Sequence, residues 1–392
     1  MADKIDLRLS KDQFQYIGSL LDGEKISLSP FLPPDDKAPV SEEGRKALAD
    51  TGVVTAGEKI GAKYKQTFSL LAGPTAFTWV IYGGIGPYNS FVIFFRDKKS
   101  VCLFESGDSF RIQDPAPAAE LLIMLNQYTG TSFFSASTAA EQLSFDEAAV
   151  LFAVIDLRRR QLLADILKGA PGDPSPMPLD VIAEWLSFGK QNRHWLVTRL
   201  REYLVPAAVP SRDAVAKALS ALTKKRLVTE KDGKYIPSEA MEIVSNRFMI
   251  LGNNLTIYSG RVGGDNEVTH LKIEVTGANQ SDLMLWEITD TDTVSVSFPS
   301  PLALTYMLSP FLDSPDFIKD IQGKPLAAAV ETDEVPCKNC KMPIAPDSKF
   351  CKHCGRVVGT DNKKPEERTC AGCGRKLPAD AKFCDGCGKT AE

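Results

Sequence analysis

The sequence predicts an α+β protein in which two similar lobes are followed by two small cysteine-rich modules. Three observations lead to this prediction. One cysteine pattern occurs twice near the C-terminus, one order of helices and strands occurs twice in the body, and the second half of the body contains helices followed by a β-hairpin. A length of 392 residues fits two or three domains of ordinary size.

The predicted boundaries follow from these repeats and from changes in composition. They are a first lobe at 1–135, a second lobe at 136–320, a linker at 321–336, a first module at 337–358, a second linker at 359–369 and a second module at 370–390. Gln322–Pro336 is rich in alanine, acidic residues and lysine, and Gly359–Arg368 is rich in charged residues, as is typical of solvated linkers. We therefore expect the two modules to be tethered heads.

The first lobe is predicted from apolar periodicity. An amphipathic helix is expected after the N-cap Ser10, with Phe14 and Ile17 on its apolar face. A strand series is expected from Phe68–Leu71 onward, and a final apolar helix around Leu121–Leu125 after a proline-rich turn.

The second lobe has the same predicted order. A helix follows the N-cap Ser144, a strand series starts at Phe248–Leu251, and an apolar helix at Leu304–Leu308 follows Pro299–Pro301. We interpret this order as an internal duplication. The alternative is one α+β domain whose halves are similar by coincidence.

The second lobe also contains a predicted helix–hairpin region at about 179–238. Helices are expected at Leu179–Leu186, at Trp195–Leu204 and after the N-cap Ser211, and Asp232-Gly233 is a strong signal for the turn of a hairpin. This order resembles a winged helix.

The two modules are predicted from eight of the nine cysteines. The first set is Cys337, Cys340, Cys351 and Cys354, and the second set is Cys370, Cys373, Cys384 and Cys387. A constant offset of 33 relates the two sets. Each CxxC turn presents two sulfurs to one metal, and the ten intervening residues allow the second turn to face the first. Two four-thiolate sites are the predicted result.

On these cysteines, the tail resembles the double zinc-ribbon modules found at the ends of many proteins, over about residues 335–390. The resemblance implies two structural Zn²⁺ ions and a module that mediates contacts. Disulfides are the alternative, which the start Met-Ala-Asp-Lys disfavours because it lacks an apolar signal segment. A catalytic zinc site would keep an open position, whereas each set here has four thiolates, so His353 is interpreted as a loop residue. Cys102, the ninth cysteine, lies in an apolar run and is interpreted as a buried strand residue.

Charge and motifs limit the function classes. The formal net charge of −4 provides no general attraction to nucleic acid, and no apolar run is long enough to span a bilayer. Gly83–Gly86 lies between strand-like runs and is expected to be a hairpin loop, not a phosphate-binding loop. His194 is expected at a helix start or on the surface and His270 on a strand, and neither lies near a nucleophile motif. We therefore expect no enzyme activity; an enzyme with distant catalytic partners is a third possibility.

The sequence thus favours a cytoplasmic, zinc-binding adaptor or chaperone-like protein that contacts protein partners and no membrane. A two-lobed α+β body is similar in architecture to the chaperones of type VII secretion systems, although no motif here matches them. The alternative is a DNA-binding regulator that uses the winged helix. Its candidate contacts are Arg212, Lys217, Ser220, Lys224, Lys225, Arg226, Lys231 and Lys234.

Overall fold

The computed structural model divides into two compact units, Met1–Ala329 and Val330–Glu392, which we call the body and the tail. In the body it describes residues 4–21, 28–31, 40–84, 88–132, 135, 140–169, 172–187, 194–203, 209–262, 268–278, 281–290 and 293–314. In the tail it describes residues 335–336, 343–344, 368–369, 373 and 376–377. Most of the two predicted linkers lies outside these ranges.

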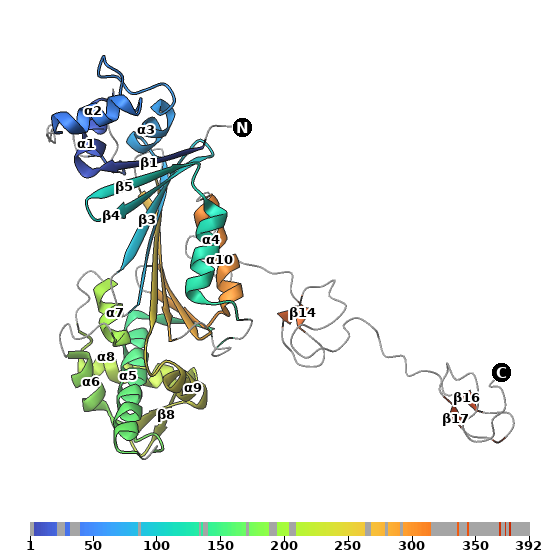
Figure 1. Ribbon diagram of the computed structural model, residues 1–392. Helices are drawn as coiled ribbons and strands as arrows, with labels where there is room; N and C mark the ends of the chain where they lie inside the picture. The colour runs from blue at the N-terminus through green and yellow to red at the C-terminus, as the bar shows by residue number, and fades with distance from the viewer. Residues whose placement is uncertain are drawn as a thin grey trace. The chain divides into compact units, whose positions relative to one another are not determined.

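The body is organised around one antiparallel sheet of ten strands (Figure 1). In spatial order these are β1 (Ile5–Ser10), β5 (Ser109–Asp114), β4 (Lys99–Ser106), β3 (Asn89–Arg96), β2 (Ala76–Gly83), β10 (Asn253–Val262), β11 (Val268–Gly277), β12 (Leu283–Asp290), β13 (Thr293–Ser297) and β6 (Ala140–Ser144). Because β2 pairs with β10, strands from both predicted lobes belong to one continuous sheet. The fold is therefore a mixed α/β body with a shared sheet in place of two separate sheets.

Each half of the sheet has the same strand order. From one edge inward the strands are β1, β5, β4, β3 and β2, and from the other edge they are β6, β13, β12, β11 and β10. In both halves, the first strand of the half forms the edge and the last strand pairs with it.

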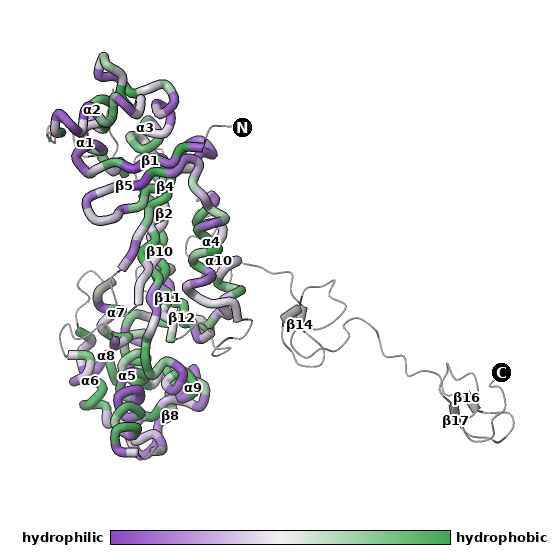
Figure 2. Tube along the Cα trace, viewed as in Figure 1, coloured by the Kyte–Doolittle hydropathy of each residue, from purple (hydrophilic) through white to green (hydrophobic). Residues whose placement is uncertain are grey.

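Helices cover one face of the sheet at both ends. Over the first half lie α1 (Lys11–Ser19), α2 (Glu42–Asp50) and α3 (Lys65–Ala72), which share a core with Leu103 and Ile112. Over the second half lies the long helix α5 (Phe145–Leu167), which packs on Trp286 and Val296. The tube in Figure 2 shows that hydrophobic residues follow the central strands and α5.

Two helices lie on the other face of the sheet, side by side in Figure 1. They are α4 (Ala118–Thr129) and α10 (Pro301–Asp313). Asn126 of α4 donates a hydrogen bond to Thr305 of α10 at 2.7 Å. Tyr82 and Trp79 of β2 point to opposite faces of the sheet, and the Tyr82 hydroxyl contacts the sulfur of Met124 in α4 at 3.4 Å. None of the helices that the structure describes is long and apolar enough to cross a bilayer.

The helix–hairpin region packs around α5. It consists of β7 (Met177–Pro178), α6 (Leu179–Ser187), α7 (Leu196–Tyr203), α8 (Arg212–Lys224), β8 (Val228–Lys231) and β9 (Lys234–Pro237), followed by α9 (Glu239–Arg247). β8 and β9 form the predicted hairpin, with Asp232 and Gly233 at φ angles of 52° and 70°. Because α6, α8 and α9 all contact α5, residues 148–159 of that helix are buried.

The predicted N-caps are confirmed. Ser10 and Ser144 both form complete capping boxes, and Ser211 caps α8. Two predicted strand starts are wrong. Phe68–Leu71 belongs to α3, and Phe248–Leu251 follows the end of α9, so the strands begin at Ala76 and Asn253. A mainly apolar segment of only four residues fits a buried strand and a buried helix equally well.

Candidate functional site

The described parts of the tail are two short hairpins. β14 (Val335–Pro336) pairs with β15 (Pro343–Ile344), and β16 (Arg368–Thr369) pairs with β17 (Lys376–Leu377). The offset between the hairpins is the same 33 residues that relates the two cysteine sets. In the sequence, the two strands of each pair lie on either side of the first CxxC of their set.

Of the eight predicted ligands, the structure describes Cys373 alone, in an exposed turn. The other seven, and His353, lie outside the described residues. The donor set itself fits zinc, because four thiolates and no open position are typical of a structural tetrahedral site. Elsewhere in the described chain, no three His, Cys, Asp or Glu side chains gather in a group that could hold a metal.

The body presents a second candidate site at the centre of the helix-covered sheet face. Val92, Trp79, Tyr258 and Lys272 are direct neighbours on β3, β2, β10 and β11. We call these four residues the central row. It runs from the edge of the core under α1–α3, which Val92 contacts, toward the core under α5, and each of its four side chains is at least partly exposed.

The central row is held by contacts among its own side chains. The rings of Trp79 and Tyr258 lie 5.6 Å apart with an angle of 30° between their planes, and the Lys272 ammonium lies 4.9 Å from the Tyr258 ring centre. Trp79 is 40% exposed, which is unusual for so large an apolar side chain in a central strand. Partial burial also raises the pKa of the Tyr258 phenol, and Glu274 adds to this effect.

A buried shelf of polar side chains continues from the central row toward α7. Thr256 donates to Glu274 at 2.6 Å, and Arg199 of α7 donates to Asn254 and Thr276. All five side chains are buried. Through Arg199 the shelf joins α7 to β10 and β11 beside the central row.

The cations of the helix–hairpin region are partly committed to internal contacts. Arg212 forms an ion pair with Asp180 at 2.7 Å. Lys225 contacts the carboxylate of Glu147 at 2.9 Å and the backbone oxygen of Gln142 at 2.8 Å.

A surface depression beside α8 adds acidic groups. Its lining includes Lys217 together with Asp146, Glu147 and Asp213, around the N-termini of α5 and α8. A phosphate approaching this face would meet three carboxylates and a single lysine of the lining.

His194 lies half-buried just before α7 and belongs to an ionic cluster. Its Nε2 lies 3.2 Å from the guanidinium of Arg159, and Arg159 also donates to the His194 backbone oxygen. Burial lowers the pKa of His194, and the charge of Arg159 lowers it further. These contacts give His194 a structural explanation, and His270 lies on β11 as predicted.

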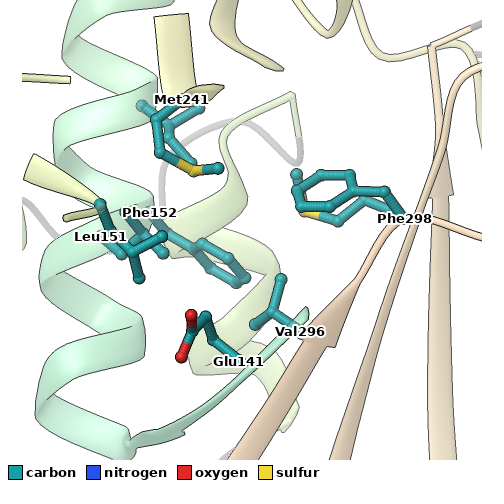
Figure 3. Close-up of a pocket in the computed structure, with 9 residues that line it drawn as sticks. Glu141, Leu151, Phe152, Met241, Val296 and Phe298 are labelled. Atoms are coloured by element: carbon teal, nitrogen blue, oxygen red, sulfur yellow. The ribbon is translucent and has the colours of Figure 1, made fainter. Parts of the chain in front are cut away.

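A small pocket lies beside α5 (Figure 3). Leu151, Phe152, Met241, Val296 and Phe298 line it, with the carboxylate of Glu141 at one side. Its volume is about 10 Å³, which is the space of a single water molecule. The pocket is too small for a substrate or cofactor.

The remaining chemical motifs have structural explanations. Gly83 ends β2, which pairs antiparallel with the next strand β3, in agreement with a loop between two paired strands; Ile85 and Gly86 lie outside the described residues. Cys102 is fully buried in β4, and burial raises the pKa of its thiol well above the usual range, so it is unreactive.

Comparison with known proteins identifies the tail. Residues 337–388 match the family model of the double zinc ribbon, so the predicted module is confirmed and the chain carries a zinc-binding domain. None of the curated proteins matches the chain. Among solved structures, a chain of the Mycobacterium tuberculosis type VII secretion system chaperone EspG5 in complex with PE25-PPE41 dimer is similar, with a TM-score of 0.43 and 10% identity, over 79% of this chain and 96% of that chain.

Proposed function

We propose that this chain is a non-enzymatic, zinc-binding adaptor of the cytoplasm. The body holds one protein partner through the central row, and the double zinc ribbon contacts a second partner. Two structural Zn²⁺ ions are held, one by Cys337, Cys340, Cys351 and Cys354 and the other by Cys370, Cys373, Cys384 and Cys387. The two hairpins with equal spacing, each around a CxxC turn, support this assignment.

One observation carries the binding function of the body. Trp79 remains 40% exposed beside Tyr258, although the same sheet face is covered by helices toward both edges. Neighbouring aromatic side chains with a cation beside them are typical of protein-binding surfaces, because they bury much area at little entropic cost. We therefore expect the partner to insert an apolar segment that carries an acidic residue opposite Lys272.

The same proposal includes two features of the body, an internal duplication and a winged helix. The body derives from a duplication, which the identical strand order of the two sheet halves supports. The region 179–238 is a winged helix that packs against α5 and supports the sheet. Its contacts with α5 through α6 and α8 favour this structural use.

A DNA-binding regulator is the second candidate. The cations that such a protein would use are Lys217, Lys224, Arg226, Lys231 and Lys234, since Arg212 and Lys225 contact carboxylates. The acidic depression around Asp213 disfavours this candidate.

The proposal is tested by co-purification of the full chain with its partners, followed by mass spectrometry. The compared variants are Trp79→Ala with Tyr258→Ala, and a chain ending at residue 329, the end of the body. We expect the aromatic variant to lose one partner at least tenfold and to keep the other, and the truncated chain to do the reverse.

Tyr306→Ala is the matched control, because Tyr306 is an exposed tyrosine on α10, on the opposite face of the sheet. It should retain both partners. Equal recovery of every partner by the aromatic variant, with an unchanged melting temperature, would exclude the central row as the binding surface.

A further inference from the structure

The two edges of the ten-stranded sheet differ. At β6, the Lys225 ammonium binds the backbone oxygen of Gln142, so an edge carbonyl is occupied by a side chain of the same protein. At β1, the backbone groups of residues 5–9 make no hydrogen bond within the described chain apart from those of the β1–β5 pairing. Unpaired edge backbone is a template for a further strand.

The side chains of β1 alternate along the strand. Leu9 is buried under α1 and Leu7 is partly buried in the same core. Asp6 and Arg8 are on the opposite face of the sheet, where Asp6 lies across from Gln113 and Arg8 lies across from Arg111. This alternation lets a further strand extend both faces without burying a charge in the apolar core.

The charges on β1 are unevenly satisfied. Asp6 accepts two hydrogen bonds from Arg111 and one from Gln113, and the Arg111 bond is the main reason that the pKa of Asp6 is lowered to about 2. Arg8 is exposed and makes no ion pair with any residue that the structure describes. Its direct neighbour on β5 is another cation, Arg111, and like charges in that position repel.

We propose that β1 pairs with β1 of a second copy of this chain, antiparallel and centred on Leu7. In this register Leu7 faces Leu7 of the second copy, and each Arg8 faces an Asp6. Two identical ion pairs form, as a two-fold axis requires. A carboxylate offers about four acceptor positions, and the contacts within one chain use three at Asp6. Arg8 thereby gains the anion that its own sheet does not provide.

Charge complementarity selects a second copy over other strands. A strand that pairs antiparallel with β1 must place an anion opposite Arg8. Two residues further along, it must place a cation opposite Asp6 that can donate to the carboxylate. The sequence Asp6-Leu7-Arg8 satisfies this rule with itself when reversed. Six-residue strands bury little area, so we expect a weak dimer that forms at micromolar concentrations.

Sedimentation velocity of the full chain at 1 to about 200 µM tests the pairing. We expect a concentration-dependent dimer that weakens when salt is raised from about 0.05 M to 0.5 M. Arg8→Glu places a glutamate opposite each Asp6, so that two like-charged pairs replace the two ion pairs, and it should raise the dimer Kd at least tenfold. Lys46→Glu, an exposed residue of α2, changes the net charge equally and should leave the Kd unchanged.

Hydrogen exchange places the contact. Backbone amides of β1 should exchange more slowly at high protein concentration than at low concentration, while those of β6 should not change. If Arg8→Glu impairs folding, Arg8→Ala provides the same comparison with a smaller rise in Kd. A monomer at about 200 µM, or a dimer that is insensitive to Arg8→Glu and without concentration-dependent protection of β1, overturns the proposal.

Discussion

Asp156 and Arg159 form an ion pair in which both side chains have no exposed surface. Asp156 also accepts hydrogen bonds from the backbone amides of Leu196 and Val197, at 3.1 and 3.0 Å, and so caps the start of α7. Arg159 donates to the backbone oxygen of Phe248 at the end of α9. One buried pair on α5 therefore joins three helices.

Asp156→Ala should lower the free energy of unfolding of the body by about 3–5 kcal/mol, because it leaves the Arg159 charge buried without its partner. The four tryptophans of the chain all lie in the body, so tryptophan fluorescence in a urea titration reports this unfolding alone. Asp180→Ala, which removes the exposed pair with Arg212, is the control and should leave the midpoint unchanged. A loss below about 1 kcal/mol in Asp156→Ala would show that the pair is not structurally important.

The stability of the body should fall as pH decreases through the histidine range. Burial and Arg159 lower the pKa of His194 in the folded state. The unfolded state then binds the proton first, so the stabilisation is present above about pH 6.5 and is lost as pH falls toward the folded pKa. His194→Gln retains an acceptor for Arg159 and should flatten the urea midpoint between about pH 7 and pH 5. His353→Gln, in the tail, is the control; a slope identical to wild type in His194→Gln would contradict the assignment.

Purified protein should contain two zinc ions per chain by elemental analysis. Cys337→Ser and Cys384→Ser should each reduce this to one, because the sites are built from separate cysteine sets. A chelator should remove both ions without shifting the tryptophan-detected melting of the body, since the tail is a separate compact unit. Fewer than one ion per chain, with reduced thiols, would exclude the four-thiolate sites.

Features that depend on a few neighbouring residues could be predicted from the sequence. Ser10 and Ser144 were predicted as caps because capping depends on residues within one turn, and the Asp232-Gly233 turn depends on backbone preferences of two residues. The double zinc ribbon of the tail was predicted for the same reason, since its pattern is a local spacing of cysteines. The strand prediction failed at Phe68–Leu71, because a segment of four residues with three apolar side chains does not separate helix from strand.

The pairing of strands that are distant in the sequence could not be predicted. The edge strands β1 and β6 are short. Nothing in their own sequence shows that β1 pairs with β5 and that β6 pairs with β13, the last strand of each half. The central row joins Trp79 to Tyr258 across a gap of more than a hundred residues, which depends on the β2–β10 pairing. Alternation places each residue on a face of its strand, but the neighbouring strand is decided by the whole sheet.

Duplex DNA should bind only weakly, with a Kd of about 10⁻⁴ to 10⁻⁶ M at physiological salt. Lys225 contacts Glu147 and the backbone of the β6 edge and is therefore part of the fold, whereas Arg212 forms an exposed ion pair with Asp180. The informative variant therefore changes Lys224, Lys231 and Lys234 to alanine and leaves Lys225 in place. Fluorescence anisotropy with a random duplex should give the same weak binding with a small decrease in its salt dependence, and co-purified protein partners should be unchanged. Nanomolar, sequence-selective binding that is lost in this variant would replace the adaptor with a DNA-binding regulator.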